Sequence, residues 1–249
     1  MSIFAAFLIS VGVADLIRGN RPRRQLSGLL SVPITVVVVA VLADLHTLAD
    51  VLLLFAGGLF AAGWVVLSAR ALRTGRGELL PLAVLGVGLL TFLLMAGLSS
   101  PVGGLIARFL DESGLQLEHV SAERALLVVG LFLIQFSTGN EIVRLVLTSV
   151  GALKPRGLPQ ASDRLRGGHL LGPLERMFIL GLGLAGEVTA AGLVIAAKGL
   201  IRFPELNARR GYGSETGVGI DEVTEYFLVG SFLSWLVSLG ALALTLLSP

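Results

Sequence analysis

The sequence predicts an all-α fold: a polytopic transmembrane helical bundle of about seven spans, forming a single integral membrane domain over residues 1–249. The first reason is composition, because 54% of the residues are hydrophobic and 14% are charged, whereas soluble domains are about 25% charged. The second reason is that apolar runs near the length of a bilayer crossing, roughly 20 residues, recur along the chain. These runs lie near residues 2–17, 26–43, 48–69, 79–99, 124–153, 174–203 and 223–247.

The run 2–17 is the shortest of these. A cleaved signal peptide carries its basic residues before the apolar run, but here they follow it, so a retained span is expected. Loops 18–24, 70–76 and 154–166 are basic, and they alternate with loops that are mainly acidic. The positive-inside rule places the basic loops in the cytoplasm, with the N-terminus outside and the C-terminus inside if there are seven spans. The exceptions in the opposite loops are Arg108, Arg209 and Arg210.

The segment Pro101–Glu123, between the fourth and fifth runs, is amphipathic. Its apolar positions recur at helical spacing, which predicts a short helix lying in the outer membrane interface. Such a helix either covers the bundle or gates a ligand, and a plain cover is the commoner role. The apolar positions are Val102, Leu105, Ile106, Phe109 and Leu110.

Charged residues inside the sixth run are informative, because an ionised side chain at a helix centre costs about 2.5–3.5 kcal/mol on insertion scales. Arg176, Glu187 and Lys198 follow one another at intervals of 11 residues. This interval is three helical turns plus about 20°, so the three residues are predicted to share one face of a single helix. Arg176 and Lys198 then lie near the two interfaces, and Glu187 lies near the bilayer centre.

The fifth run carries a second polar stripe at steps of three and four residues. Because the fifth and sixth runs are consecutive antiparallel spans, Arg144 is expected to approach Glu187. We therefore predict an intramembrane polar cluster, which is either a functional site or a self-neutralised network that fixes helix packing. The stripe comprises Ser137, Asn140, Glu141, Arg144 and Thr148, and the predicted cluster comprises Asn140, Glu141, Arg144 and Glu187.

Further charged residues gather near the ends of the sixth and seventh runs. They are predicted either to bind anionic lipid headgroups or to clasp the two helices together, since long basic side chains reach the interface easily. These candidate interfacial residues are Glu175, Arg176, Lys198, Arg202, Thr224 and Glu225. Asp15, near the end of the first run, is interpreted as a cap or interface residue. A stripe of small residues in the sixth run permits close helix approach and makes a homo-oligomer plausible.

Several kinds of chemistry lack their sequence patterns. Cysteine is absent, which excludes disulfides, thiolate metal sites and a cysteine nucleophile. The three histidines are isolated, and the chain contains neither a His-Glu-x-x-His nor a Gly-x-Ser-x-Gly motif. We predict no catalytic residues, no metal, no cofactor and no nucleic-acid partner; the expected partners are membrane lipids, a second copy or another protein.

Three segments of the last third resemble the C-terminal membrane region of DUF3307-type bacterial proteins. They begin at Gly167, Val194 and Thr224, and the resemblance covers residues 167–239. The resemblance implies a bacterial inner (cytoplasmic) membrane location but no activity. It also implies that glutamine often stands where this chain has Glu187, which argues against an essential proton-carrying role there. The residues that match together are Glu175, Arg176, Lys198, Arg202, Thr224 and Glu225.

Three functions remain open from the sequence. The first is transport or handling of a small polar or anionic solute, or of an anionic lipid, through the buried Glu/Arg cluster. The second is a structural or sensory membrane subunit that binds a protein partner without transporting anything. The third, with the least support, is an enzyme acting on a lipid headgroup through Asp221, Glu222 and Glu225.

Overall fold

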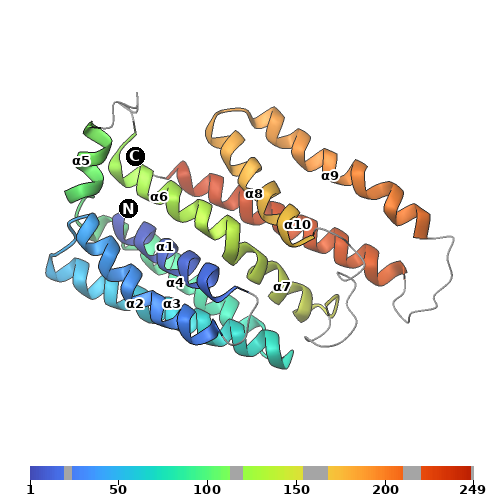
Figure 1. Cartoon of the computed structure of the whole chain (residues 1–249), viewed down its shortest axis with the longest axis horizontal. Coiled ribbons are helices and arrows are strands. Elements are labelled where there is room, and N and C mark those ends of the chain that lie inside the picture. Colours follow the sequence, from blue (N-terminus) through green and yellow to red (C-terminus); the bar gives the residue numbers. More distant parts are fainter. Residues whose placement is uncertain (20–23, 113–119, 154–167, 210–219, 248–249) are drawn as a thin grey trace.

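The computed structural model in Figure 1 describes residues 1–19, 24–112, 120–153, 168–209 and 220–247, with side chains omitted for 168–170, 201–209 and 220–225. Every regular element within these ranges is helical. In chain order the elements are α1 (Ser2–Arg18), α2 (Gln25–Leu42), α3 (Leu48–Thr74), α4 (Leu79–Leu94), η2 (Ala96–Leu98), α5 (Gly104–Glu112), α6 (Ala122–Leu133), η3 (Ile134–Thr138), α7 (Gly139–Ser149), α8 (Gly168–Leu184), α9 (Val188–Arg209) and α10 (Ile220–Thr245).

Four helical stretches are long and apolar enough to cross a membrane: Gln25–Leu42, Leu48–Thr74, Ala122–Ser149 and Tyr226–Thr245. The outward faces of several helices are apolar as well. Large exposed side chains include Ile34 and Val41 on α2, Phe55 on α3, and Leu228 and Phe232 on α10. Water would oppose so much exposed apolar surface, whereas lipid accepts it. The all-helical fold is therefore confirmed, and the four long apolar helices fit a membrane protein, while the number of spans remains a prediction.

Helix α1 is the core of the N-terminal half. It packs against α2, α3, α4, α6 and η3, and most of its residues, including Phe4, Phe7 and Val11, are buried. Glycine allows the closest contact, because a Cβ at Gly12 would lie 2.7 Å from the Cβ of Leu133 on α6. The shortest of the predicted runs is thus enclosed by protein rather than by lipid.

The stretch Ala122–Ser149 is one long helix that contains a π-helical turn, η3, between α6 and α7. We refer to it as α6–α7. It packs against α1, α3 and α4 on one side and against α8 and α10 on the other. Figure 1 shows it running between the two halves of the bundle. It is consequently the one element among those described that contributes side chains to both halves.

The single helix predicted over 174–203 is wrong. Helix α8 ends at Leu184 and α9 begins at Val188, with Gly186 at φ +81° between them, a conformation that glycine adopts without steric cost. The two helices fold back on each other, and Lys198 Nζ on α9 lies 2.6 Å from Glu175 Oε2 on α8. Arg176, Glu187 and Lys198 therefore do not share a helix face.

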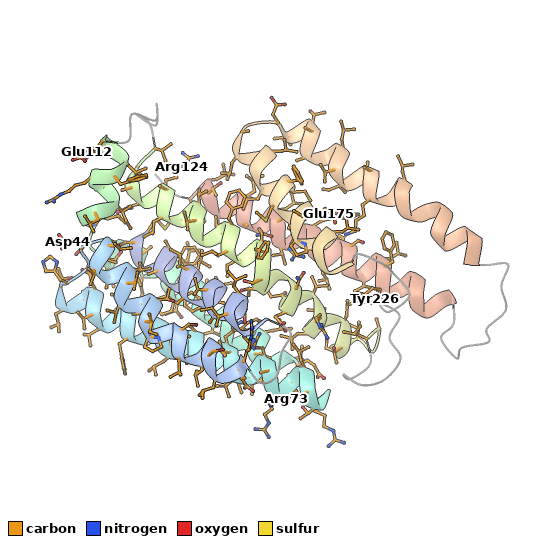
Figure 2. The ribbon with its side chains drawn as sticks, in the orientation of Figure 1. Asp44, Arg73, Glu112, Arg124, Glu175 and Tyr226 are labelled. Carbon is orange, nitrogen blue, oxygen red and sulfur yellow. The ribbon has the colours of Figure 1, made fainter. Side chains whose placement is uncertain are left out.

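Because of this hairpin, an even number of described helices alternates in direction through the bundle, rather than the odd number predicted. Helices α1, α2, α3, α4, α6–α7, α8, α9 and α10 alternate in direction, so both ends of the chain lie at the same end of the bundle (Figure 1). A seven-span arrangement would place them at opposite ends. Figure 2 shows Arg73 at the other end of the bundle, far from Asp44, Glu112 and Arg124, which lie near the chain termini.

Helix α5 occupies part of the predicted amphipathic segment. It packs against α2 and α6 at the end of the bundle that carries the termini. Val102 is buried and Ile106 packs against the core, while Leu105 and Phe109 are exposed. A helix occupies Gly104–Glu112, whereas an amphipathic helix lying in the outer membrane interface remains a prediction.

Candidate functional site: two buried polar clusters

A first polar cluster joins α1, α3 and α6–α7 inside the N-terminal half, and we call it the N-terminal cluster. Its acid and base are one turn apart on α1, where Arg18 Nη2 donates to Asp15 Oδ1 at 2.7 Å. Trp64 Nε1 donates to the other carboxylate oxygen, Oδ2, at 2.8 Å. Arg18 Nη1 donates to Ser68 Oγ at 2.8 Å and to the Val65 carbonyl at 3.0 Å. The members are Asp15, Arg18, Trp64, Ser68, Thr138 and Glu141.

The α6–α7 side of this cluster is less completely bonded. Glu141 Oε2 lies 3.8 Å from Arg18 Nη2, and this buried oxygen has no hydrogen-bond partner among the described residues. The buried Thr138 hydroxyl lies against the Asp15 carboxylate and interacts with it. Asp15, Arg18 and Glu141 are only 4%, 5% and 8% exposed. One arginine thus faces two buried acids.

A second polar cluster, the C-terminal cluster, lies on the other side of α6–α7 and is centred on Arg176. Arg176 is the middle residue of α8 and is 1% exposed, so it lies about 12 Å along the helix from either end of α8 at 1.5 Å per residue. Its Nη2 donates to Asn140 Oδ1 at 2.7 Å, and its Nη1 donates to Ser234 Oγ on α10 at 3.2 Å. The members are Gln135, Asn140, Arg176, Ser234 and Ser238.

The strongest contact of Arg176 depends on the π-helical turn. Arg176 Nε and Nη2 both donate to the Gln135 carbonyl, at 3.0 and 2.8 Å. In an α-helix that carbonyl would accept the N–H of Gly139, four residues on. Here the Gly139 N–H turns back to the Ile134 carbonyl instead. The extra residue in the turn therefore frees a backbone acceptor inside the bundle, and a guanidinium occupies it.

Glycines make room for this guanidinium. A Cβ on Gly139 would lie 2.7 Å from Arg176 Nε, and one on Gly172 would lie 3.6 Å from Nη1. The acceptors that hold Arg176 are neutral: a carbonyl, an amide and a hydroxyl. Within the described residues, no carboxylate forms a salt bridge with it. The C-terminal cluster consequently contains a buried positive charge that its direct ligands do not neutralise.

The neighbouring acid, Glu175, points elsewhere. It pairs with Lys198 on α9 at 2.6 Å and accepts a hydrogen bond from Trp235 Nε1 on α10 at 3.1 Å. Figure 2 shows Glu175 within the group of α8, α9 and α10. Three helices therefore meet at this carboxylate, and the pair Glu175–Lys198 fastens the hairpin.

The structure separates the residues predicted as one intramembrane cluster. Asn140 and Glu141 are buried as expected, but Asn140 belongs to the C-terminal cluster and Glu141 to the N-terminal cluster. Arg144 is half-buried one turn further along α7. Glu187 lies exposed in the α8–α9 turn, so its predicted position at the bilayer centre beside Arg144 is wrong.

The predicted interfacial group is also divided. Arg176 is not at an interface of the bundle but in the middle of α8, while Glu175 and Lys198 form the hairpin ion pair. The side chains of Arg202, Thr224 and Glu225 lie outside the described residues, as do those of Asp221 and Glu222. A clasp between those residues remains a prediction.

Sequence reasoning missed several members of both clusters. Asp15 was interpreted as a cap or interface residue, and Arg18 was counted as part of a basic loop, yet both are buried and bonded to each other. Their spacing of three residues was the available signal, since oppositely charged residues at that spacing pair on a helix. No local signal marks the π-helical turn that exposes the Gln135 carbonyl.

The chemistry available to these clusters is that of charge and proton binding. The described residues place no group of three or more histidine, cysteine or acidic side chains where a metal ion could bind. The chain matches no protein-family model, and comparisons with curated proteins and with solved structures give no significant match. The resemblance of residues 167–239 to DUF3307-type proteins remains a prediction.

Proposed function

We propose that the protein handles or transports a small anionic solute or the headgroup of an anionic lipid within the membrane, with Arg176 as its principal anion-attracting group. One observation carries the proposal. Arg176 is fully buried at the middle of a helix, and every acceptor bonded to it among the described residues is neutral. A buried positive charge whose direct ligands are neutral attracts anions in a medium of low polarity, and intramembrane ionisable residues most often mark substrate or ion pathways.

The surroundings of Arg176 support the proposal in a second way. A π-helical turn, an element that occurs frequently at functional sites, exposes the carbonyl that orients the guanidinium. The guanidinium makes four donor bonds within the described part of the chain, and one N–H of Nη1, on the side of Gly172, has no acceptor there. Arginine is well suited to phosphate and carboxylate, because its planar donors match two oxygens at once.

The alternative is a structural or sensory subunit that transports nothing and binds a protein partner. It is favoured by the way Arg176 links α6–α7, α8 and α10 through bonds that all stay within the chain. A buried network of this kind can serve helix packing alone. The two functions differ in one respect: only the first requires that the charge of Arg176 meet a mobile anion.

Purified protein in liposomes tests the proposal with two probes, radiolabelled inorganic phosphate for uptake and fluorescent phosphatidylglycerol for movement between leaflets. We expect one probe to move, and Arg176→Gln to slow it by about tenfold or more, equivalent to 1.4 kcal/mol. Arg73→Gln is the matched control, because Arg73 is exposed at the end of the bundle.

Thermal unfolding of both variants checks that the bundle is intact. Failure of both probes with the unaltered protein, or equal rates for folded Arg176→Gln, would favour the structural alternative. Movement of phosphate but not of the lipid would identify a free anion as the substrate, and the reverse would identify a headgroup.

We infer that the protein lies in a bacterial inner membrane with its basic end in the cytoplasm. This inference is supported by the folded-back α8–α9 hairpin, which brings the end of α9 at Arg209 to the end of the bundle that carries Arg73. Arg209 thereby stops being an exception to the positive-inside rule. In this proposed orientation both chain termini lie on the outer side, in contrast to the cytoplasmic C-terminus expected from seven spans.

A further inference from the structure

The guanidinium of Arg176 is closed on the edge that faces α6–α7. Its Nε and Nη2 both donate to the Gln135 carbonyl, at 3.0 and 2.8 Å, and the second N–H of Nη2 donates to Asn140 Oδ1 at 2.7 Å. The backbone of Gly139 lies so close to this edge that a Cβ there would approach Nε to 2.7 Å. A ligand atom therefore has no room on this side of the guanidinium.

The open edge of the guanidinium is that of Nη1. This nitrogen has two N–H groups, and one of them donates to Ser234 Oγ on α10 at 3.2 Å. The described residues supply no acceptor for the other. The Arg176 side chain is 1% exposed. A buried donor without an acceptor is uncommon in proteins and calls for an occupant.

Gly172 leaves space beside this open edge. It lies about one turn before Arg176 on α8 and is half-buried. A Cβ built on Gly172 would lie 3.6 Å from Nη1 and 3.7 Å from Asn140 Oδ1, with no other atom nearer. Both distances are ordinary van der Waals contacts, so a methyl group would fit here without displacing a neighbour. Because glycine carries only a hydrogen at this point, the space is left to a ligand atom in contact with Nη1.

Ser234 supplies a second donor at the same edge. Its oxygen accepts from Nη1, and a serine hydroxyl also has one hydrogen to donate. Ser234 is 3% exposed, and no described residue accepts that hydrogen. The two donor atoms, Nη1 and Ser234 Oγ, are 3.2 Å apart. They can therefore reach two oxygens carried by one central atom, as in the paired recognition of carboxylate and phosphate groups.

We propose that an oxyanion binds at this Nη1 edge, with one oxygen against the N–H beside Gly172 and a second against the Ser234 hydroxyl. The inference rests on the proposed function and specifies where its anion is bound and by which group. That group is a phosphate diester or a carboxylate, whether a lipid or a free solute carries it. Gly172 and Ser234 then determine specificity, the first by the space that it leaves and the second by its hydroxyl.

The probe for this site is dimethyl phosphate, a phosphate diester with one negative charge and no acyl chains. Isothermal titration into the protein in maltoside micelles, which contain no oxyanion, measures its dissociation constant. We expect the unaltered protein to bind dimethyl phosphate and Arg176→Gln to lose binding. Chloride has the same charge but a single atom, so we expect it to bind about tenfold more weakly or less, having only one acceptor for the two donors.

Gly172→Ala and Gly181→Ala form a matched pair of variants on α8. Each adds one methyl group where the nearest atom lies 3.6 or 3.8 Å away, so both should fold and should unfold at the same temperature as each other. The methyl group at 172 occupies the space beside Nη1, whereas the one at 181 faces Phe132. We expect Gly172→Ala to weaken dimethyl phosphate binding about tenfold or more, and Gly181→Ala to leave it unchanged.

Adding phosphatidylglycerol to the micelles identifies the source of the oxyanion, because a phosphate diester joins its headgroup to the lipid. A headgroup that reaches the Nη1 edge competes with dimethyl phosphate and weakens its apparent affinity for the unaltered protein. An unchanged affinity assigns the edge to a free anion. Both results support an oxyanion site at Nη1.

Two results would overturn the inference: equal dimethyl phosphate affinities for Gly172→Ala and Gly181→Ala, or chloride bound as tightly as dimethyl phosphate. Binding that is lost in Arg176→Gln but persists in Gly172→Ala would leave the proposed function standing and remove only the Nη1 edge. Absence of binding to the unaltered protein, or binding that survives in Arg176→Gln, would remove both. The two failures are therefore distinguishable.

Discussion

At Arg176, a side chain takes the place of a backbone amide. The Gln135 carbonyl loses the N–H of Gly139 to the π-helical turn and gains two donors from the guanidinium. A hydrogen bond to a charged group contributes about 1.5–3 kcal/mol. The bonds from Arg176 therefore compensate for the backbone hydrogen bond that the π-helical turn removes from the Gln135 carbonyl. The turn and Arg176 consequently depend on each other for stability.

Gly139→Ala tests this dependence. The added methyl group would lie 2.7 Å from Arg176 Nε, so the guanidinium must move away from the Gln135 carbonyl. Overpacking of this kind typically costs about 1–3 kcal/mol, and we expect the unfolding temperature of the protein in detergent to fall accordingly. Gly192→Ala is the control, because no atom lies within 4 Å of a Cβ at Gly192 on α9. Equal unfolding temperatures for the two variants would contradict the proposed packing of Arg176.

Residue by residue, the sequence revealed which polar side chains are buried better than it revealed their partners. Asn140 and Glu141 were both expected inside the bundle. Successive helical residues point about 100° apart, so the two side chains reach different halves of the protein. Their partners depend on the rotation of α6–α7 and on its extra residue, and neither can be derived from spacing within one helix.

Among the elements, the α8–α9 hairpin is where prediction and structure differ most. The apolar run 174–203 was interpreted as one span, although 30 residues would form a helix about 45 Å long, well beyond the hydrocarbon thickness of about 30 Å. That excess length was the available signal of a break. The break itself falls at Gly186, whose positive φ has no hydrophobic signature.

Exchange of charges tests the hairpin. Glu175 and Lys198 are 23 residues apart in the sequence, which is about 35 Å along a continuous helix, but they are paired at 2.6 Å across the hairpin. We expect Glu175→Lys and Lys198→Glu each to destabilise the protein by about 1 kcal/mol or more, because each places like charges together.

The double variant Glu175→Lys/Lys198→Glu should recover most of this loss, as measured by thermal unfolding. Additive losses in the double variant would show that the two side chains do not meet. The Trp235–Glu175 bond is lost in the exchange, so full recovery is not expected.

For the whole molecule, the parity of the helices decides which ends share a membrane face. The alternation of basic and acidic loops predicted a bundle with one basic end. Counting the sixth run once reversed the side of everything after it, including the C-terminus. The unrecognised turn between α8 and α9 therefore changed the predicted side of the C-terminus, although most of the individual helices were correctly expected.

Single-cysteine labelling in intact cells tests this topology without background, because the chain contains no cysteine. A membrane-impermeant maleimide should label Glu112→Cys, at the end of α5, and a cysteine appended after Pro249. It should not label Thr74→Cys, at the end of α3, until the cells are opened. Labelling at Glu112→Cys but not at the appended cysteine would instead support the odd number of membrane spans predicted from the sequence.

The burial of α1 has a consequence for the order in which the protein assembles. Helix α1 precedes along the chain the helices that enclose it, and one of them, α6–α7, follows more than a hundred residues later. Asp15 and Arg18 can already neutralise each other within an isolated α1, at three-residue spacing. The ion pair thus lowers the cost of placing these two charges in lipid before Glu141 and Trp64 pack around α1.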